Sequence, residues 1–115
     1  MNVSITYNPN IKNSVLDELA KEMPRIISET MDTGYVARVK PEQISLAFSS
    51  SNPRDTGADI KIMVFAQSND PRISTEDVRA KMILDTVIAL NSKSGEKCSV
   101  DVRLYLMEVG VAEYN

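Results

Sequence analysis

The stretch that decides the fold is DIKIMVF, residues 59–65. Isoleucine and valine occupy every second position, and two of the residues between them, Met63 and Phe65, are also apolar. A period of two is typical of a β-strand, and apolar residues on both faces indicate a strand that is covered on both sides. We therefore expect residues 60–65 to form a central strand, around which the rest of the fold is arranged.

Working outward from this strand, the sequence predicts three more strands and two helices. Alternating apolar residues indicate the strands, and apolar residues at helical spacing indicate the helices. The expected elements are a strand over 3–7, a helix over 14–33, a strand over 43–48, the strand over 60–65, a helix over 74–91 and a strand over 98–106. This β-α-β-β-α-β order predicts an α+β protein with a single domain, 1–115, made of a first βαβ unit over 1–57 and a second over 58–115.

Several single residues mark the expected elements. Ser14 and Ser74 each stand three residues ahead of an aspartate, a spacing at which serine caps a helix. Pro24 removes a backbone donor from the first helix, so we expect a kink there or two shorter helices. We place Leu84 at the centre of the core-facing stripe of the second helix, and we expect Cys98 to be a buried, unreactive thiol in the last strand.

The composition excludes several classes of function. The 115 residues include 13 basic and 16 acidic side chains, and the formal net charge of -3 disfavours nucleic acid or a membrane surface as a partner. The chain has no histidine, the commonest zinc ligand and the usual catalytic base, so we expect no metal and no cofactor. Its apolar runs are too short to span a membrane and its first residues do not form a signal pattern, which predicts a cytoplasmic protein.

Two architectures share the predicted order of elements: the ferredoxin-like sandwich, and a four-stranded mixed sheet with both helices on one face. A polar loop over 49–57, rather than a tight hairpin turn, separates the second and third strands. This loop favours two separate βαβ units.

The second half of the chain carries the motifs of a known family. An arginine turn, Asp70-Pro71-Arg72-Ile73-Ser74, leads from the central strand into a helix that bears Glu76 and Arg79, and the last strand ends at Glu108. In this order of features the chain resembles the tautomerase superfamily, whose members are similar to macrophage migration inhibitory factor. It is nearest the 5-carboxymethyl-2-hydroxymuconate isomerase-like branch.

The resemblance implies a homotrimer with a small pocket near the amino terminus of each subunit. In the family an amino-terminal proline acts there as a general base. This sequence begins Met1-Asn2, so the terminal proline is lacking, and the size of asparagine is expected to leave Met1 in place. We therefore expect a trimeric, catalytically weak or silent protein that keeps a pocket for a small carboxylate. Two alternatives stay open: an active keto-enol tautomerase for a small unsaturated acid, and a ferredoxin-like ligand-binding or oligomerising domain.

Five residues are candidates for this site. The α-amino group of Met1 is the candidate base, because α-amines as a class titrate near neutral pH; alternatively, Met1 begins a strand and packs. Arg72 matches the arginine turn of the family, where it would hold a carboxylate bidentately, or it is a solvated loop residue. Arg38 and Lys40 stand where the family places charged groups that orient the substrate, and Tyr105 would supply a phenol; the alternatives are solvated or interface positions.

Overall fold

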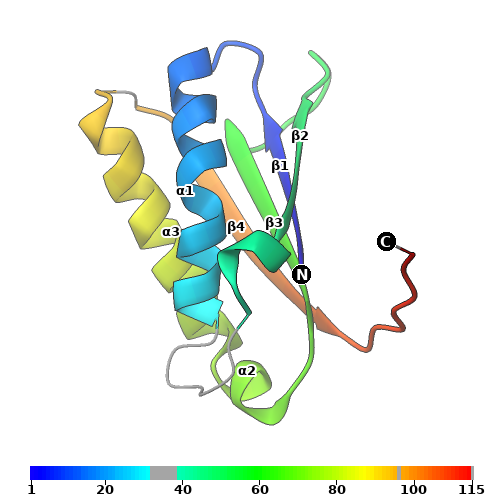
Figure 1. The fold of residues 1–115 in the computed structure, drawn as a ribbon. Coiled ribbons are helices and arrows are strands. Elements are labelled where there is room, and N and C mark those ends of the chain that lie inside the picture. Colours follow the sequence, from blue (N-terminus) through cyan, green and yellow to red (C-terminus); the bar gives the residue numbers. More distant parts are fainter. Residues whose placement is uncertain (32–38, 96, 115) are drawn as a thin grey trace.

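The fold is a four-stranded sheet with its two long helices on one side. The computed structural model describes residues 1–31, 39–95 and 97–114. The elements in chain order are β1 (Asn2–Tyr7), α1 (Asn13–Met31), the 3-10 helix η1 (Pro41–Gln43), β2 (Ser45–Ser50), β3 (Ile60–Gln67), α2 (Asp70–Ser74), α3 (Glu76–Lys93) and β4 (Val100–Met107). Figure 1 shows α1 and α3 side by side over the same face of the sheet, with the short helix α2 beyond one of its ends.

The sheet is mixed and has the strand order β2-β1-β3-β4. β1 is parallel to β2 and antiparallel to β3, and β3 is parallel to β4. Each parallel pair is connected through a long helix, as parallel neighbours require. The predicted α+β class and the mixed four-stranded sheet are confirmed. The ferredoxin-like alternative is wrong. In that fold a strand from the other βαβ unit lies between the two parallel strands of a unit, whereas here the parallel strands of each unit are direct neighbours.

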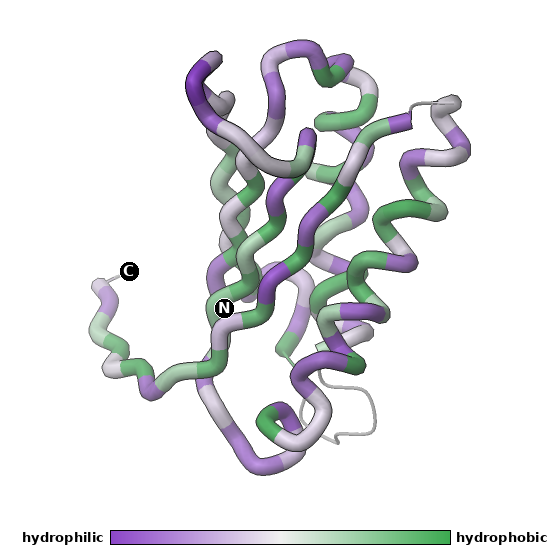
Figure 2. The backbone as a smooth tube through the Cα atoms, turned by 180° about the vertical axis from the view of Figure 1, so that it is seen from behind, coloured by the Kyte–Doolittle hydropathy of each residue, from purple (hydrophilic) through white to green (hydrophobic). Residues whose placement is uncertain are grey.

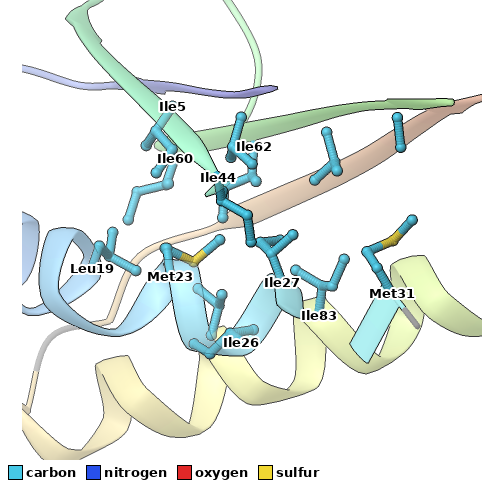
Figure 3. Packing of buried hydrophobic residues seen from close by; sticks show 14 of the residues in the cluster. Ile5, Leu19, Met23, Ile26, Ile27, Met31, Ile44, Ile60, Ile62 and Ile83 are labelled. Carbon is cyan, nitrogen blue, oxygen red and sulfur yellow. The ribbon is translucent and has the colours of Figure 1, made fainter. Parts of the chain in front are cut away.

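The hydrophobic core lies between the helices and the sheet. The residues of β1 and β3 that face the helices are almost completely buried, apart from the half-buried Tyr7 at the end of β1, so the alternation in the sequence becomes one apolar face. Figure 3 shows these side chains against those of the helices, where the labelled residues are Ile5, Ile60 and Ile62 from the strands, Leu19, Met23, Ile26, Ile27 and Met31 from α1, Ile83 from α3, and Ile44.

The helices differ from the sequence-based expectation in three respects. α1 begins at Asn13, so Ser14 lies inside its first turn and does not cap it. The helix continues through Pro24 to Met31, so the alternative of two shorter helices is wrong, because apolar packing on both sides of Pro24 outweighs the loss of one backbone hydrogen bond. On α3 the fully buried apolar residues are Ile83 and Val87, whereas Leu84 is only half-buried. The choice of Leu84 as the centre of the core-facing stripe was therefore wrong by one residue.

The connection between β3 and α3 contains a helix that the sequence pattern did not predict. Asn69 caps α2, because its side-chain oxygen accepts a hydrogen bond from the backbone N–H of Arg72 at 2.9 Å. Ser74 ends α2, and its hydroxyl donates to the carbonyl of Pro71 at 3.1 Å. The predicted cap at Ser74 is therefore wrong, since α3 begins only after Thr75.

Cys98 also lies in a different setting from the one expected. β4 begins at Val100, so Cys98 precedes the strand and is half-buried. Its sulfur lies 3.6 Å from Nδ2 of Asn91, which is itself buried on α3.

The face of the sheet away from the helices carries apolar side chains that no described helix covers. Met63 and Phe65 on β3 share this face with Tyr105 and Met107 on β4, because parallel partners in register point the same way. The rings of Phe65 and Tyr105 stack with their centroids 5.1 Å apart and an interplanar angle of 12°. Tyr105 and Met107 are each 39% exposed.

The helices in the described part of the chain lack the length and hydrophobicity that a membrane span requires.

Candidate functional site

Three of the candidate residues lie at one end of the sheet. β1 and β2 begin at this end and β3 and β4 finish there, since Asn2 is in register with both Ser45 and Phe65. Met1 immediately precedes β1, Lys40 leads into β2 through η1, and Arg72 follows β3 (Figure 1). The topology thus brings together segments that are far apart in the sequence.

Met1 extends the pairing of the first strand by one residue. Its carbonyl oxygen accepts a hydrogen bond from the backbone N–H of Ser45 at 3.0 Å. Its side chain is half-buried and packs against the core. The backbone of Met1 is therefore held at the edge of the candidate site, in line with the expectation that it continues the strand.

Arg72 is buried, with only 6% of its surface exposed. Nη1 of its guanidinium donates a hydrogen bond of 2.7 Å to the carbonyl oxygen of Gln67, the last residue of β3. Arg72 is therefore not the solvated loop arginine of the alternative interpretation. It fastens α2 to the end of the central strand, and its guanidinium is held in one orientation.

The other candidates are distributed differently. Lys40 is exposed, and its backbone N–H donates to Oε1 of Gln43 at 3.0 Å, which closes the turn of η1. Arg38 lies outside the described residues. Tyr105 is near the same end of the sheet, but its ring lies on the face away from the helices, where it stacks on Phe65.

Tyr105 borders two surface hollows. One, of about 370 Å³, lies between α3 and the edge strand β4. The other, of about 580 Å³, lies on the face away from the helices and is also lined by Lys61 and Arg103. Met1, Lys40 and Arg72 line neither of them.

The two cations of the larger hollow already have partners. Nε of Arg103 donates to Oδ2 of Asp101 at 3.0 Å, and this hydrogen bond raises the pKa of Arg103 above its ordinary value. Nζ of Lys61 donates to the carbonyl oxygen of Thr56 at 2.6 Å. No cluster of three metal-ligating side chains occurs in the described parts of the chain.

A second buried arginine, Arg79, plays a role that the sequence analysis did not assign to it. It is 8% exposed, and its guanidinium donates to the carbonyl oxygens of Thr30, at 3.0 Å, and Met31. Its Nε donates to Oγ1 of Thr75 at 2.8 Å. The last carbonyls of a helix lack partners within the helix, so Arg79 satisfies the end of α1 and ties it to the start of α3. Its position four residues before Ile83, on the buried stripe, is the signal that would have revealed it.

The arrangement of sheet and helices is that of the tautomerase superfamily, and the resemblance inferred from the sequence is confirmed at the level of the fold. A malonate semialdehyde decarboxylase superposes with a TM-score of 0.69 at 10% identity, over 100% of this chain and 91% of that one. A member of the cis-3-chloroacrylic acid dehalogenase family gives a TM-score of 0.66 at 9% identity, over 94% and 76% of the two chains. A fused 4-OT, a wild-type symmetric trimer, gives 0.64 at 9% identity, over 95% and 85%. No protein-family model and no curated protein sequence matches the chain.

Proposed function

We propose that this chain is a trimeric protein of the tautomerase fold, catalytically weak or silent, that binds a small carboxylate. The ligand would lie at the end of the sheet where Met1, Lys40 and Arg72 gather. The observation that carries the proposal is the buried guanidinium of Arg72, fixed at the carboxyl end of the central strand and at the same end as the first residue of β1.

The chemistry of Arg72 favours a carboxylate. A guanidinium is planar, remains charged at any physiological pH and matches the two oxygens of a carboxylate. Because its hydrogen bond to Gln67 already holds the side chain, little conformational freedom remains to be lost when a ligand binds. Lys40, exposed at the same end, adds a second positive charge.

The uncovered face of the sheet supports self-association. Tyr105 and Met107 lie exposed beside Met63 and Phe65, and a second copy packed against this face would remove their apolar surface from water. A fused 4-OT with the same fold is a symmetric trimer. A closed, symmetric assembly of this kind is the common solution for such a face.

Weak or absent catalysis follows from the residues at the start of β1. The segment that leads into β1 reads Met1-Asn2-Val3, without the proline whose amine acts as the general base in the family that the sequence resembles. The second candidate function, a keto-enol tautomerase that uses the α-amino group of Met1, is supported by the position of Met1 at the same end as Arg72. Turnover separates these two functions.

The test combines mass, binding and turnover. Light scattering should give about three times the chain mass of 12.8 kDa. Titration with a small carboxylate, such as phenylenolpyruvate, should show binding that is about 10- to 100-fold weaker in Arg72→Ala, the loss expected for a charge-assisted pair. Arg54→Ala, which removes an exposed arginine from the polar loop after β2, is the matched control and should bind as the wild type does.

The outcomes discriminate between the parts of the proposal. Since Arg72 is buried, circular dichroism must first show that Arg72→Ala is folded, and Arg72→Lys, which keeps the charge but not the planar fork, serves as a second variant. Unchanged affinity in a folded Arg72→Ala variant would place the ligand elsewhere, and unchanged affinity in Arg72→Lys would contradict the bidentate contact. A monomeric mass would contradict the trimer. Rapid conversion of phenylenolpyruvate or 2-hydroxymuconate would establish the second candidate function.

A further inference from the structure

The outer surface of α3 is more apolar than that of its neighbour α1. Over its described span, Asn13–Met31, α1 exposes mainly charged side chains, and none of its large apolar side chains is exposed. On α3, by contrast, Val78 is 58% exposed and Ile88 is 47% exposed. Figure 2, in which α3 lies at the right, shows apolar segments in green along this helix. Apolar side chains on an exposed helix face gain free energy when a partner covers them.

Four residues of α3 form a continuous row on this outer surface, which we call the α3 stripe. They are Val78, Lys81, Asp85 and Ile88, and all four are exposed. They are separated by three, four and three positions, the spacing that keeps side chains on one side of a helix. At the centre, Nζ of Lys81 and Oδ1 of Asp85 form an ion pair at 2.7 Å. Along the helix the α3 stripe is therefore apolar, positive, negative and apolar.

This order is complementary to itself when a second α3 runs in the opposite direction. If position 81 lies opposite position 85 of the partner, each Lys81 meets the partner's Asp85, and each Val78 meets the partner's Ile88. Every contact then occurs twice, as a twofold axis requires. A parallel pair would place lysine against lysine and aspartate against aspartate, and like charges oppose such an approach.

We propose that two copies of this chain associate through the α3 stripe, with their α3 helices antiparallel. The axes of packed helices lie about 8–10 Å apart, so these side chains would fill the space between the two helices. A hollow of about 410 Å³ opens beside Ile88, between the last turns of α3 and the segment before β4, and the partner's Val78 would cover its rim. Specific shape and charge thus favour a second copy over an unrelated apolar partner.

The pattern of charges also selects the register of the pair. If position 85 lay opposite position 85, the two aspartates would repel each other. If position 85 lay opposite position 88, Asp85 would pack against the partner's Ile88 and lose water without gaining a cation. If position 81 lay opposite position 78, Lys81 would pack against the partner's Val78 in the same unfavourable way. The register that pairs position 81 with position 85 avoids all three conflicts.

This contact is separate from the one proposed for the trimer. The α3 stripe lies on the helix side of the sheet, whereas the uncovered apolar side chains lie on the opposite face (Figure 1). The α3 pair can therefore join two single chains or two trimers, and in either case it doubles the mass of the associating unit.

The experiment reverses one charge at a time and then mixes the two variants. In Lys81→Glu the α3 stripe carries two negative charges, and in Asp85→Lys it carries two positive charges, so neither variant should pair with itself. In an equimolar mixture every charge of the pair again meets an opposite charge on the partner. Each chain still keeps its like-charged neighbours along its own helix. Recovery in the mixture therefore reports contact between copies and not the stability of α3.

Sedimentation velocity measures this association. Because a single helix pair buries less surface than a standard interface, the chain concentration is set to about 100 μM. We expect the wild type to reach twice the mass of its unit, each variant alone to associate at least tenfold more weakly, and the mixture to recover to within about threefold of the wild type. Arg25→Glu, which reverses an exposed, ion-paired charge on α1, is the matched control and should associate as the wild type does.

Three results would overturn the inference. If the wild type does not double in mass at this concentration, the α3 pair does not form. If either variant alone associates as strongly as the wild type, the contact lies elsewhere on the surface. If the mixture of variants stays apart, the helices are not antiparallel in this register. The mass of the undoubled unit, measured on either variant, tests the proposed trimer separately.

Discussion

Arg79 and Arg25 lie in opposite settings, and we expect them to contribute very different amounts to the stability of the fold. Arg79 is 8% exposed and donates to two backbone carbonyls at the end of α1 and to Thr75. Arg25 lies on the outer face of α1, where its side chain is 51% exposed and forms ion pairs with Glu22 at 2.9 Å and Glu29 at 3.0 Å. Arg25 has the more obvious charged partners, yet we expect Arg79→Ala to be the more destabilising change.

The magnitudes follow from burial. A hydrogen bond that involves a charged group contributes about 1.5–3 kcal/mol, and a buried acceptor left without its donor pays a desolvation cost. Since the three bonds of Arg79 act together and water can replace part of them, we expect Arg79→Ala to lower the free energy of unfolding by about 2–4 kcal/mol. Exposed ion pairs contribute between about 0 and 1 kcal/mol, so Arg25→Ala should cost less than about 1 kcal/mol.

Urea unfolding at a fixed protein concentration, followed by circular dichroism, measures both values. In 0.5 M salt the small effect of Arg25→Ala should shrink further, whereas the effect of Arg79→Ala should remain, because buried bonds are poorly screened. Arg79→Lys should recover only part of the loss, since an ammonium cannot make the same divergent contacts. The reasoning would be refuted if the two alanine variants lost the same stability, or if Arg25→Ala lost more.

Two further predictions concern the core and a loop. Ile83→Ala should lower the free energy of unfolding by about 3–4 kcal/mol, because three buried carbons are removed and a cavity remains. The control is Ile88→Ala, at a position 47% exposed on the same helix, which should cost less than about 1 kcal/mol. Equal losses of stability for the two variants in urea unfolding would contradict the assigned face of α3. Gly57→Ala should cost about 1–3 kcal/mol, because φ is 114° and an added Cβ would lie 2.8 Å from Cε of Lys61. Gly95→Ala, with φ of 73° but open space around it, should lower the melting temperature less than Gly57→Ala does. If Gly95→Ala lowered it more, Lys61 would have moved away freely from the added Cβ at position 57.

Part of the candidate site could be predicted from the sequence. The turn that carries Arg72 was identified by its order after an apolar strand and before a helix, and both features are local patterns. Its burial and its bond to Gln67 were not predictable, because they depend on how α2 folds back on the end of β3. Arg79 was noted only as a feature of the helix, since no local pattern shows that it reaches the end of α1.

The sequence by itself determined the order of the four strands and the two long helices, and the inner face of the central strand. Side-chain period is a local property: Ile60, Ile62 and Val64 alternate with their neighbours whatever the strand pairs with, and all three are buried. Tertiary structure alone decided that β2 and β4 lie at opposite edges of the sheet, and that the ring of Tyr105 lies on the face away from the helices, where it stacks on Phe65. The strand order, and which side chains of the sheet are covered, depend on contacts between residues tens of positions apart. No single stretch of sequence shows how favourable those contacts are.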